Sequence, residues 1–243
     1  MWNDDYFEFL VKYVWKIDKP INIVDFGCGY GFLGIKLLPL LAQGSSYTGI
    51  DKGKELLIEA SNLFGSSPYH THFVEADLTE YVAEQRYDLA ICQAVLRHIP
   101  SPENVLKKMI DSVVPGGKVI CIEVNRAMEE AGFFSSDYTH DRIQETIKIK
   151  QQWHAEQESG GRDYKTGIKI PMYMEKMGLI DVGARVNDFV EHISPLSNRQ
   201  AYDSDILLSL QSRGFATDHG DNTHVVSARC LIISCGTKPF AQC

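Results

Sequence analysis

The chain has 243 residues, of which 44% are hydrophobic and 23% charged, and its formal net charge is -8 at pH 7. This length can bury one sizeable hydrophobic core, so we expect a single domain over residues 1–243. The negative charge argues against nucleic acid as the main partner, because contacts to phosphates need a basic surface.

A helix, a strand and a second helix open the chain. Residues 6–16 carry apolar side chains at helical spacing and predict a helix, which Pro20 interrupts. The apolar run at residues 21–26 predicts a strand, and residues 32–38 predict the next helix. A glycine-rich turn therefore joins the first strand to the second helix.

Three alternate glycines, Gly27, Gly29 and Gly31, form this turn. Glycine lets the backbone turn tightly and approach a ligand closely, and the helix start beyond it offers free N–H groups. The pattern predicts a nucleotide-type site at the carboxyl end of the strand. Asp25, just before the glycines, would repel a pyrophosphate but suits a ligand with an ammonium group. Gly29, Gly31 and Gly34 also fit the G-x-G-x-x-G pattern of nicotinamide enzymes, so that reading stays open at this point.

Strand and helix predictions then alternate along the chain. Strands are predicted at residues 46–50, 72–75, 87–93 and 118–124, and helices at residues 54–64 and 103–113. This alternation predicts an α/β fold, with a doubly wound, mostly parallel sheet covered by helices on both faces.

The regular alternation of predicted strands and helices ends at Asn125. Residues 126–158 and 166–177 are predicted to be mostly helical, and we expect the segment 126–177 to form a helical lid over the ligand-binding edge of the sheet. Glycines at positions 160 and 161 separate the two helical parts.

Two further strands, predicted at residues 182–189 and 225–234, bring the expected sheet to seven strands. A second insertion, residues 194–223, lies between them and is predicted to contain a helix at residues 205–213. The histidines and aspartates at residues 218–224 are interpreted as a polar loop rather than a metal site, and no metal is expected.

Two acids stand at the ends of predicted strands. Asp51 ends the second strand about 20 residues past the glycines, where a carboxylate can accept both hydroxyls of a ribose. An isolated aspartate there can also simply face solvent. Asp77 follows the third strand and could instead cap the short turn that begins at Leu78.

Residues 24–124 resemble the class I S-adenosylmethionine-dependent methyltransferases, in the small-molecule branch that includes the quinone-biosynthesis enzymes. Asp25 followed by the glycines matches the family's first motif, and Tyr87-Asp88 matches the pair that opens its fourth strand. The sequence VVPGG at residues 113–117 resembles the family's L-x-P-G-G turn. Nicotinamide enzymes share only the glycine turn and the acid in the place of Asp51, so the resemblance implies S-adenosylmethionine as cofactor and a Rossmann-like fold.

The resemblance implies a role for each motif residue. Asp25 would order the methionine amino end, directly or through water, and Gln93 would lie below the methionine part. The glycines would let the chain curve beneath the cofactor. Asp51 would hold the ribose. An aspartate in the place of Asp77 accepts a hydrogen bond from the adenine amino group, and the backbone N–H of the next residue, here Leu78, meets a ring nitrogen.

Methyl transfer is an in-line displacement, so catalysis consists mainly of alignment and exclusion of water. No residue is an obvious general base. His98 is the first candidate because its unperturbed pKa is near ~6.5, and Glu123 and His140 follow. A histidine bonded to the backbone at a helix end is the competing interpretation of His98.

The sequence therefore predicts methyl transfer to a small-molecule acceptor. The alternatives are a methyltransferase acting on a tRNA base or a protein, a non-catalytic S-adenosylmethionine-binding protein, and an NAD-dependent oxidoreductase. No apolar run reaches the ~20 residues of a membrane span, the acidic start is unlike a signal peptide, and the cysteines form no C-x-x-C pair. We expect a cytoplasmic protein with reduced thiols and no membrane contact, and the sequence leaves its oligomeric state open.

Overall fold

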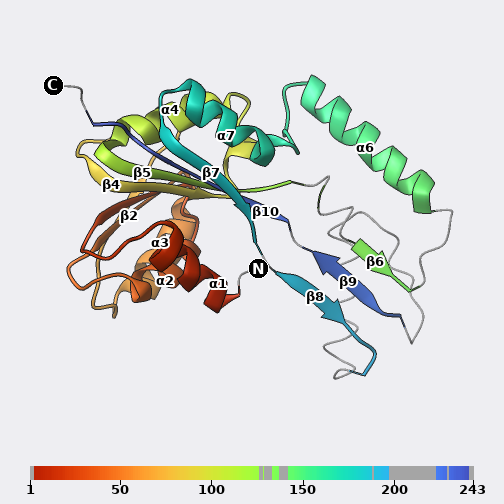
Figure 1. Cartoon of the computed structure of the whole chain (residues 1–243), viewed down its shortest axis with the longest axis horizontal. Helices are drawn as coiled ribbons and strands as arrows, with labels where there is room; N and C mark the ends of the chain where they lie inside the picture. The colour runs from red at the N-terminus through yellow and green to blue at the C-terminus, as the bar shows by residue number, and fades with distance from the viewer. Residues whose placement is uncertain are drawn as a thin grey trace.

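The computed structural model describes residues 3–125, 128, 133–136, 142–187, 189–196, 223–228 and 230–240. A seven-stranded sheet in the order β3-β2-β1-β4-β5-β10-β7 forms its centre (Figure 1). Its strands are β1 (Asn22–Phe26), β2 (Ser46–Asp51), β3 (His70–Glu75), β4 (Tyr87–Gln93), β5 (Val113–Val124), β7 (Ile180–Val186) and β10 (Leu231–Thr237).

The pairing within this sheet is mostly parallel. Strand β1 pairs in parallel with β2 and β4, β2 with β3, and β4 with β5, whereas β10 is antiparallel to both β5 and β7. The predicted doubly wound, seven-stranded α/β fold is confirmed. The strand order reverses between β1 and β4, and ligands of open α/β sheets bind outside the carboxyl ends of the strands at such a point.

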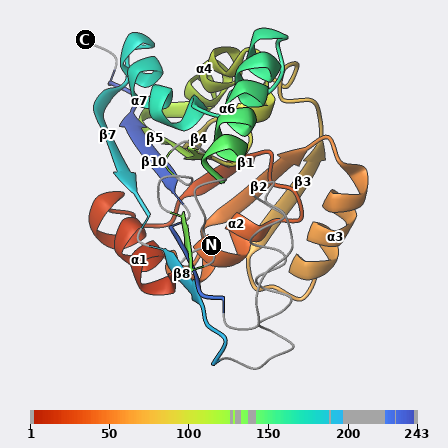
Figure 2. The ribbon, with the colours of Figure 1, turned by 90° about the vertical axis from the view of Figure 1, so that its right-hand side faces the viewer.

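Helices cover both faces of the sheet (Figure 1, Figure 2). One face carries apolar side chains of α1 (Asp4–Phe9), η1 (Leu10–Val14), α2 (Phe32–Leu37), η2 (Leu38–Leu40) and α3 (Lys54–Phe64). The other face carries those of η3 (Leu96–His98), α4 (Pro102–Ser112) and α7 (Thr166–Lys176). Each face therefore has its own buried cluster, and the strands between them are apolar on both sides.

The opening helix differs from its prediction at the carboxyl end. The α-helix α1 changes into the π-helix η1, in which Trp15 N donates to Leu10 O at 2.7 Å, and the helical segment does not continue through Lys16. Lys16 has φ 54°, a left-handed backbone conformation that ends a right-handed helix.

A second sheet was not predicted. It has three strands in the order β6-β9-β8, with bounds Phe133–Ser135, Val225–Ala228 and Val190–Ile193. The strand predicted at 225–234 is therefore wrong as one element, because β9 belongs to the small sheet and β10 to the large one. Residues 126–158 were predicted to be mostly helical, and the strand β6 within them was not predicted; there Phe133 and Phe134 pair with Ser227 and Val226 across an antiparallel ladder.

The predicted lid contains two helices with different surroundings. Helix α7 packs on the sheet, with Ile170 and Met174 buried, as a connecting helix of a doubly wound fold does. Helix α6 (Arg142–Glu158) stands out from the sheet in Figure 1.

The helix predicted at 205–213 and His140 lie outside the described residues. No helix in the described part of the chain is both long and apolar enough to cross a membrane.

Candidate functional site

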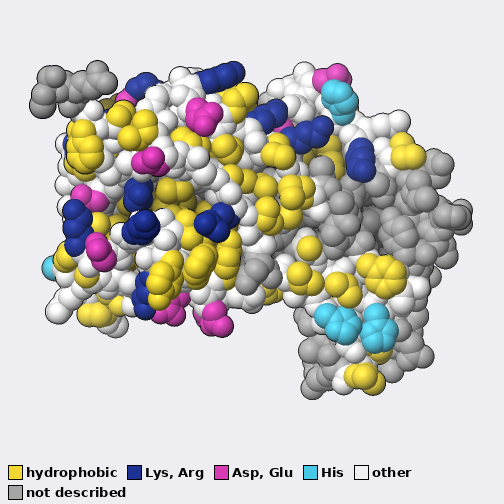
Figure 3. Space-filling model, viewed as in Figure 1, with side chains coloured by type: hydrophobic (Ala, Val, Ile, Leu, Met, Phe, Trp, Pro, Cys, Tyr) yellow, Lys and Arg dark blue, Asp and Glu magenta, His cyan; other side chains and the backbone are white. Residues whose placement is uncertain are grey.

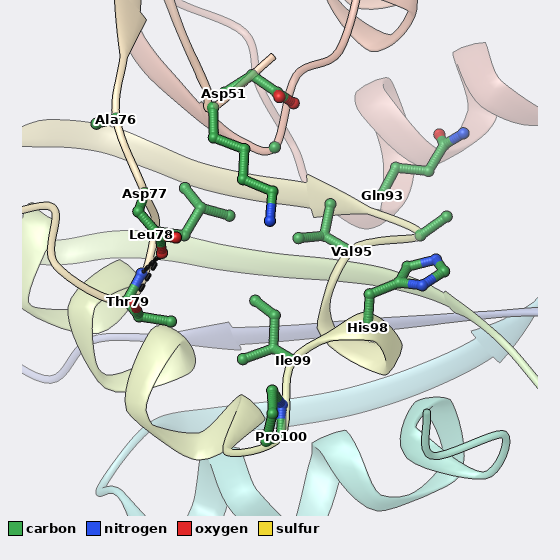
Figure 4. A pocket seen from close by; sticks show the side chains of 13 residues that line it. Asp51, Ala76, Asp77, Leu78, Thr79, Gln93, Val95, His98, Ile99 and Pro100 are labelled. Carbon is green, nitrogen blue, oxygen red and sulfur yellow. Dashed lines mark hydrogen bonds between the residues drawn. The ribbon is translucent and has the colours of Figure 1, made fainter. Parts of the chain in front are cut away.

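A cavity of about 400 Å³ lies at the carboxyl ends of β1, β2 and β4 (Figure 4). Six of the residues predicted from the sequence line it, namely Gly27, Asp51, Asp77, Leu78, Gln93 and His98. They come from four connections, those that follow β1, β2, β3 and β4, which the parallel sheet brings to one edge. The volume lies within the range of small-ligand sites, roughly 300–1,000 Å³.

The glycine turn follows β1 at this edge of the sheet. Gly27, Gly29 and Gly31 all have positive φ, at 79°, 54° and 84°. A Cβ on Gly27 would lie 2.5 Å from Val95 Cγ2 and would clash with that side chain. A Cβ on Gly29 would meet no described atom within 4 Å. Gly31 is the N-cap residue of α2. Only glycine combines these backbone angles with this close approach at Gly27.

Asp51 fastens the glycine turn to the end of β2. Its Oδ2 accepts a hydrogen bond from Gly29 N at 2.9 Å, and its Oδ1 accepts one from Gly53 N at 2.8 Å. A carboxylate oxygen can accept two hydrogen bonds, so each oxygen retains one acceptor position at the cavity. The arrangement suits a ligand that presents two neighbouring hydroxyl groups.

Asp25 lies beneath the turn and not in the cavity wall. Its side chain is 1% exposed, and Tyr47 OH donates a hydrogen bond to its Oδ2 at 2.6 Å. Burial raises the pKa of Asp25 to about 7, against the opposing effect of that hydrogen bond. The carboxylate faces Tyr47, so the expected direct contact with a ligand amino group does not match its position, and an indirect role through the turn remains a prediction.

Asp77 and Leu78, which follow β3, bring a hydrogen-bond acceptor and a donor to the cavity wall. Asp77 Oδ1 accepts from Thr79 N at 2.8 Å and from Thr79 Oγ1 at 2.6 Å (Figure 4). These bonds lower the pKa of Asp77. The capping role considered for Asp77 is therefore present. Within the described chain, Asp77 Oδ2 and the Leu78 N–H have no hydrogen-bond partner, so both remain available to a ligand.

His98 lies at the end of η3, on the cavity side (Figure 4). Arg97 Nε donates a hydrogen bond to its Nε2 at 3.0 Å. Desolvation, followed by the charges of Arg97 and Arg162, lowers the pKa of His98, so the ring is neutral at pH 7 and carries its proton on Nδ1. The lone pair that a general base would use is thus already occupied by Arg97.

Glu123, the second candidate base, is fully buried in β5. Its Oε1 accepts hydrogen bonds from Val95 N at 2.8 Å and Leu96 N at 2.7 Å, whereas Oε2 has no partner among the described residues. Burial raises its pKa to about 7. Since Val95 lines the cavity and Leu96 begins η3, Glu123 holds this wall in place and lies behind it.

The raised pKa of Glu123 predicts a pH dependence of stability. The folded state binds this proton more tightly than the unfolded chain, so its contribution to stability is complete below pH ~4.5 and is lost as pH rises through about 7. A Gln at this position cannot ionise. Between about pH 5 and pH 8, the unfolding free energy of the wild type should therefore fall by ~2–3 kcal/mol relative to that of Glu123→Gln.

Urea unfolding across this pH range measures that difference. Glu55→Gln, which removes one exposed carboxylate at the start of α3, is the matched control. A pH-independent difference for Glu123→Gln would contradict the raised pKa.

Several cavity residues were not found from the sequence. Lys52, Val95, Ile99 and Pro100 line the cavity, although none of them was assigned a role at the site from the sequence. Ala94 also lines it and has φ 57°, which is unusual for a residue other than glycine. Only its position directly after the fourth strand pointed to it, because that strand was predicted to end at the site.

Comparisons with known proteins agree with this architecture. A family model described as a methyltransferase domain matches residues 3–181. Ubiquinone biosynthesis O-methyltransferases of Klebsiella pneumoniae and Salmonella typhimurium are 32% identical over 107 residues, which is 43% of this chain and 43% of each relative. The match thus spans less than half the length of these curated relatives.

Solved structures share the fold at low sequence identity. Phosphoethanolamine N-methyltransferase 2 of Haemonchus contortus, in complex with S-adenosyl-L-methionine, has a TM-score of 0.56 and 16% identity, covering 95% of this chain and 51% of that one. The N-methyltransferase NodS of Bradyrhizobium japonicum, in complex with S-adenosyl-L-homocysteine, has a TM-score of 0.56 and 12% identity, covering 98% and 86%.

Proposed function

The chain belongs to the methyltransferase-domain family, and from this premise we propose that it transfers the methyl group of S-adenosylmethionine to a small-molecule acceptor. The observation that carries the proposal is the cavity at the carboxyl ends of β1, β2 and β4. Family membership excludes the NAD-dependent oxidoreductase that the glycine pattern alone left open.

The residues around the cavity fit the cofactor. Asp51 retains one acceptor position on each oxygen for the ribose hydroxyls. Asp77 Oδ2 can accept from the adenine amino group, and the Leu78 N–H can donate to a ring nitrogen. When bound, S-adenosylmethionine supplies a methyl group activated by a positively charged sulfur. The chain contributes orientation and exclusion of water.

Gly27 and Gln93 border the remaining part of the cavity, where we propose that the methionine moiety lies. Gly29 and Gly31 shape the turn that follows β1, and Asp25, which accepts a hydrogen bond from Tyr47, directly precedes that turn. The sheet edge beyond Gln93 and His98 then faces the acceptor.

A small-molecule acceptor agrees with the printed names of the similar proteins, which are ubiquinone biosynthesis and phosphoethanolamine methyltransferases. The net charge of -8 speaks against a tRNA substrate. A protein substrate and a non-catalytic cofactor-binding role remain the alternatives, because catalysis by alignment requires no particular catalytic residue.

Thermal unfolding with three ligands tests the cofactor. S-adenosylmethionine and S-adenosylhomocysteine should raise the unfolding temperature with dissociation constants of ~1–10 μM, and NAD should not. Stabilisation by NAD alone would overturn the proposal. A screen of metabolite pools for release of S-adenosylhomocysteine then identifies the acceptor, and a protein that binds the cofactor but releases none with any pool favours the non-catalytic role.

The role of His98 can be tested with the acceptor in hand. If His98 removes a proton from the acceptor, His98→Asn should lose ~100-fold or more in turnover, and the wild-type rate should rise with pH through the lowered pKa of His98. Because Arg97 occupies Nε2, we expect the other outcome, in which His98→Asn retains turnover within ~3-fold. Turnover per folded molecule, measured across pH for both proteins, separates the two outcomes.

A further inference from the structure

A second cavity, of about 590 Å³, lies between the end of η1 and the strands β7 and β10. Its lining includes Trp15 and the charged residues Lys16, Lys118, Asp181 and Arg185. Lys118 lies in the first half of β5, whereas the cofactor cavity follows the carboxyl ends of β1, β2 and β4. The second cavity lies along β5, β10 and β7 and shares no lining residue with the proposed methyl-transfer site.

The charges around this cavity are unbalanced. Three cationic side chains and one carboxylate line it, in a chain whose net charge is -8. None of the three cations forms a hydrogen bond or an ion pair with any described residue, although Arg185 lies 5.9 Å from the centre of the Phe9 ring. Figure 3 shows Lys and Arg side chains, with Asp, Glu and apolar side chains among them, on the face that carries α1 and β7. Uncompensated positive charge around a hollow attracts anions.

Two residues that line the second cavity have an unusual, left-handed backbone conformation. In the described chain, the residues other than glycine with positive φ are Lys16, Ala94 and Asp181, at 54°, 57° and 51°. Ala94 lines the cofactor cavity, and the other two line the second cavity. Such strained positions cluster at ligand sites, because the surrounding structure must hold a conformation that costs free energy.

Trp15, which is among the residues that line the cavity, carries a buried hydrogen-bond donor. Its side chain is 0% exposed, and its indole Nε1 has no acceptor among the described residues. A buried donor without a partner is uncommon in folded proteins and calls for an explanation.

We propose that the cavity between η1 and β7 is a second binding site, for a small organic anion with two or more negative charges. Lys16, Lys118 and Arg185 would bind its phosphate or carboxylate groups, and Val14 and Ile233 provide apolar contact for its carbon frame. Asp181 offsets one of the three positive charges, and the net positive charge that remains matches a doubly charged anion. The site is independent of the cofactor, so its occupancy is measurable whether or not the protein transfers methyl groups.

Calorimetry with pyrophosphate and with citrate, at constant ionic strength, tests the proposal. Lys118→Gln and Arg185→Gln should each weaken binding by ~10-fold, because each removes a charged hydrogen-bond donor. Lys54→Gln is the matched control, since Lys54 is an exposed lysine on α3, which packs at the β2–β3 edge of the sheet. It should leave both affinities unchanged. Binding of pyrophosphate alone assigns a phosphate ligand, and binding of citrate alone assigns a carboxylate ligand.

The indole N–H signals in a proton–nitrogen correlation spectrum locate the binding directly. The signal that disappears in Trp15→Phe should shift on titration with the anion, and the signal of Trp153 on α6 should not. No binding of either anion, or equal loss of affinity in Lys118→Gln and Lys54→Gln, would overturn the proposed site. Circular dichroism of each variant confirms that it is folded before the affinities are compared.

Discussion

Asp51→Ala is expected to weaken binding of S-adenosylhomocysteine by ~100-fold or more. The variant loses the acceptor of two backbone N–H groups, Gly29 N and Gly53 N, together with the two proposed hydrogen bonds to the ribose hydroxyls. Hydrogen bonds to a charged acceptor contribute ~1.5–3 kcal/mol each, and ~2.7 kcal/mol corresponds to 100-fold in affinity. Titration calorimetry with S-adenosylhomocysteine measures the change. Asp111→Asn, which removes an exposed carboxylate paired with Lys107 on α4, should bind as the wild type does.

A second ligand separates the ribose contact from the support of the glycine turn. The 2′-deoxy analogue of S-adenosylhomocysteine should bind the wild-type protein more weakly than the parent compound, and Asp51→Ala should discriminate less between the two. The coupling free energy of this cycle isolates the contact between Asp51 and the hydroxyl. Equal discrimination by both proteins would remove Asp51 from the ribose site and leave it only the structural role.

Gly27→Ala is expected to destabilise the protein by ~3 kcal/mol and to abolish measurable cofactor binding. A left-handed backbone costs a residue with a Cβ ~1–2 kcal/mol, and overpacking adds ~1–3 kcal/mol. Gly27 combines φ 79° with a Cβ position 2.5 Å from Val95 Cγ2. Gly29→Ala is the matched control, because it has φ 54° and no described atom within 4 Å of its Cβ position. It should lose only the ~1 kcal/mol of backbone strain.

Urea unfolding of both variants measures these stabilities, and calorimetry measures their cofactor affinities. If the steric contact is the cause, shortening its partner should relieve it, so the double variant Gly27→Ala/Val95→Ala should recover part of the lost stability. Equal stabilities for the two single variants would mean that Val95 moves aside, and the loss at Gly27 would then reflect backbone strain alone.

The sequence determined the frame of the site because the relevant signals are local. Hydrophobic runs separated by helical segments predict parallel strands, and glycine, aspartate and proline mark where strands end. The carboxyl ends of parallel strands meet at one edge, so Gly27, Asp51 and Asp77 could be placed in one cavity without coordinates. His98 followed from the same argument, because it comes shortly after the fourth strand, whereas Gln93 was placed by the family resemblance.

Contacts between distant residues were decided only by the tertiary structure. Asp25 and Tyr47 are 22 residues apart, and the parallel register that aligns β1 with β2 brings the phenol to the carboxylate and turns it away from the cavity. Glu123 reaches Val95 and Leu96 because β5 runs beside β4. Neither side chain differs in sequence pattern from an acid that faces a ligand, because burial depends on what the neighbouring strand supplies.

The two sheets illustrate the same division between local and tertiary information. The apolar residues at 225–234 correctly predicted extended chain, but the chain divides there into β9, which pairs with β6 and β8, and β10, which pairs with β5 and β7. Lys16, Lys118, Asp181 and Arg185 likewise lie far apart in sequence and meet at one cavity. The spacing of apolar residues and the turn residues determine whether a segment forms a helix or a strand. The partner that a strand pairs with depends on which packing of the whole chain buries the most apolar surface.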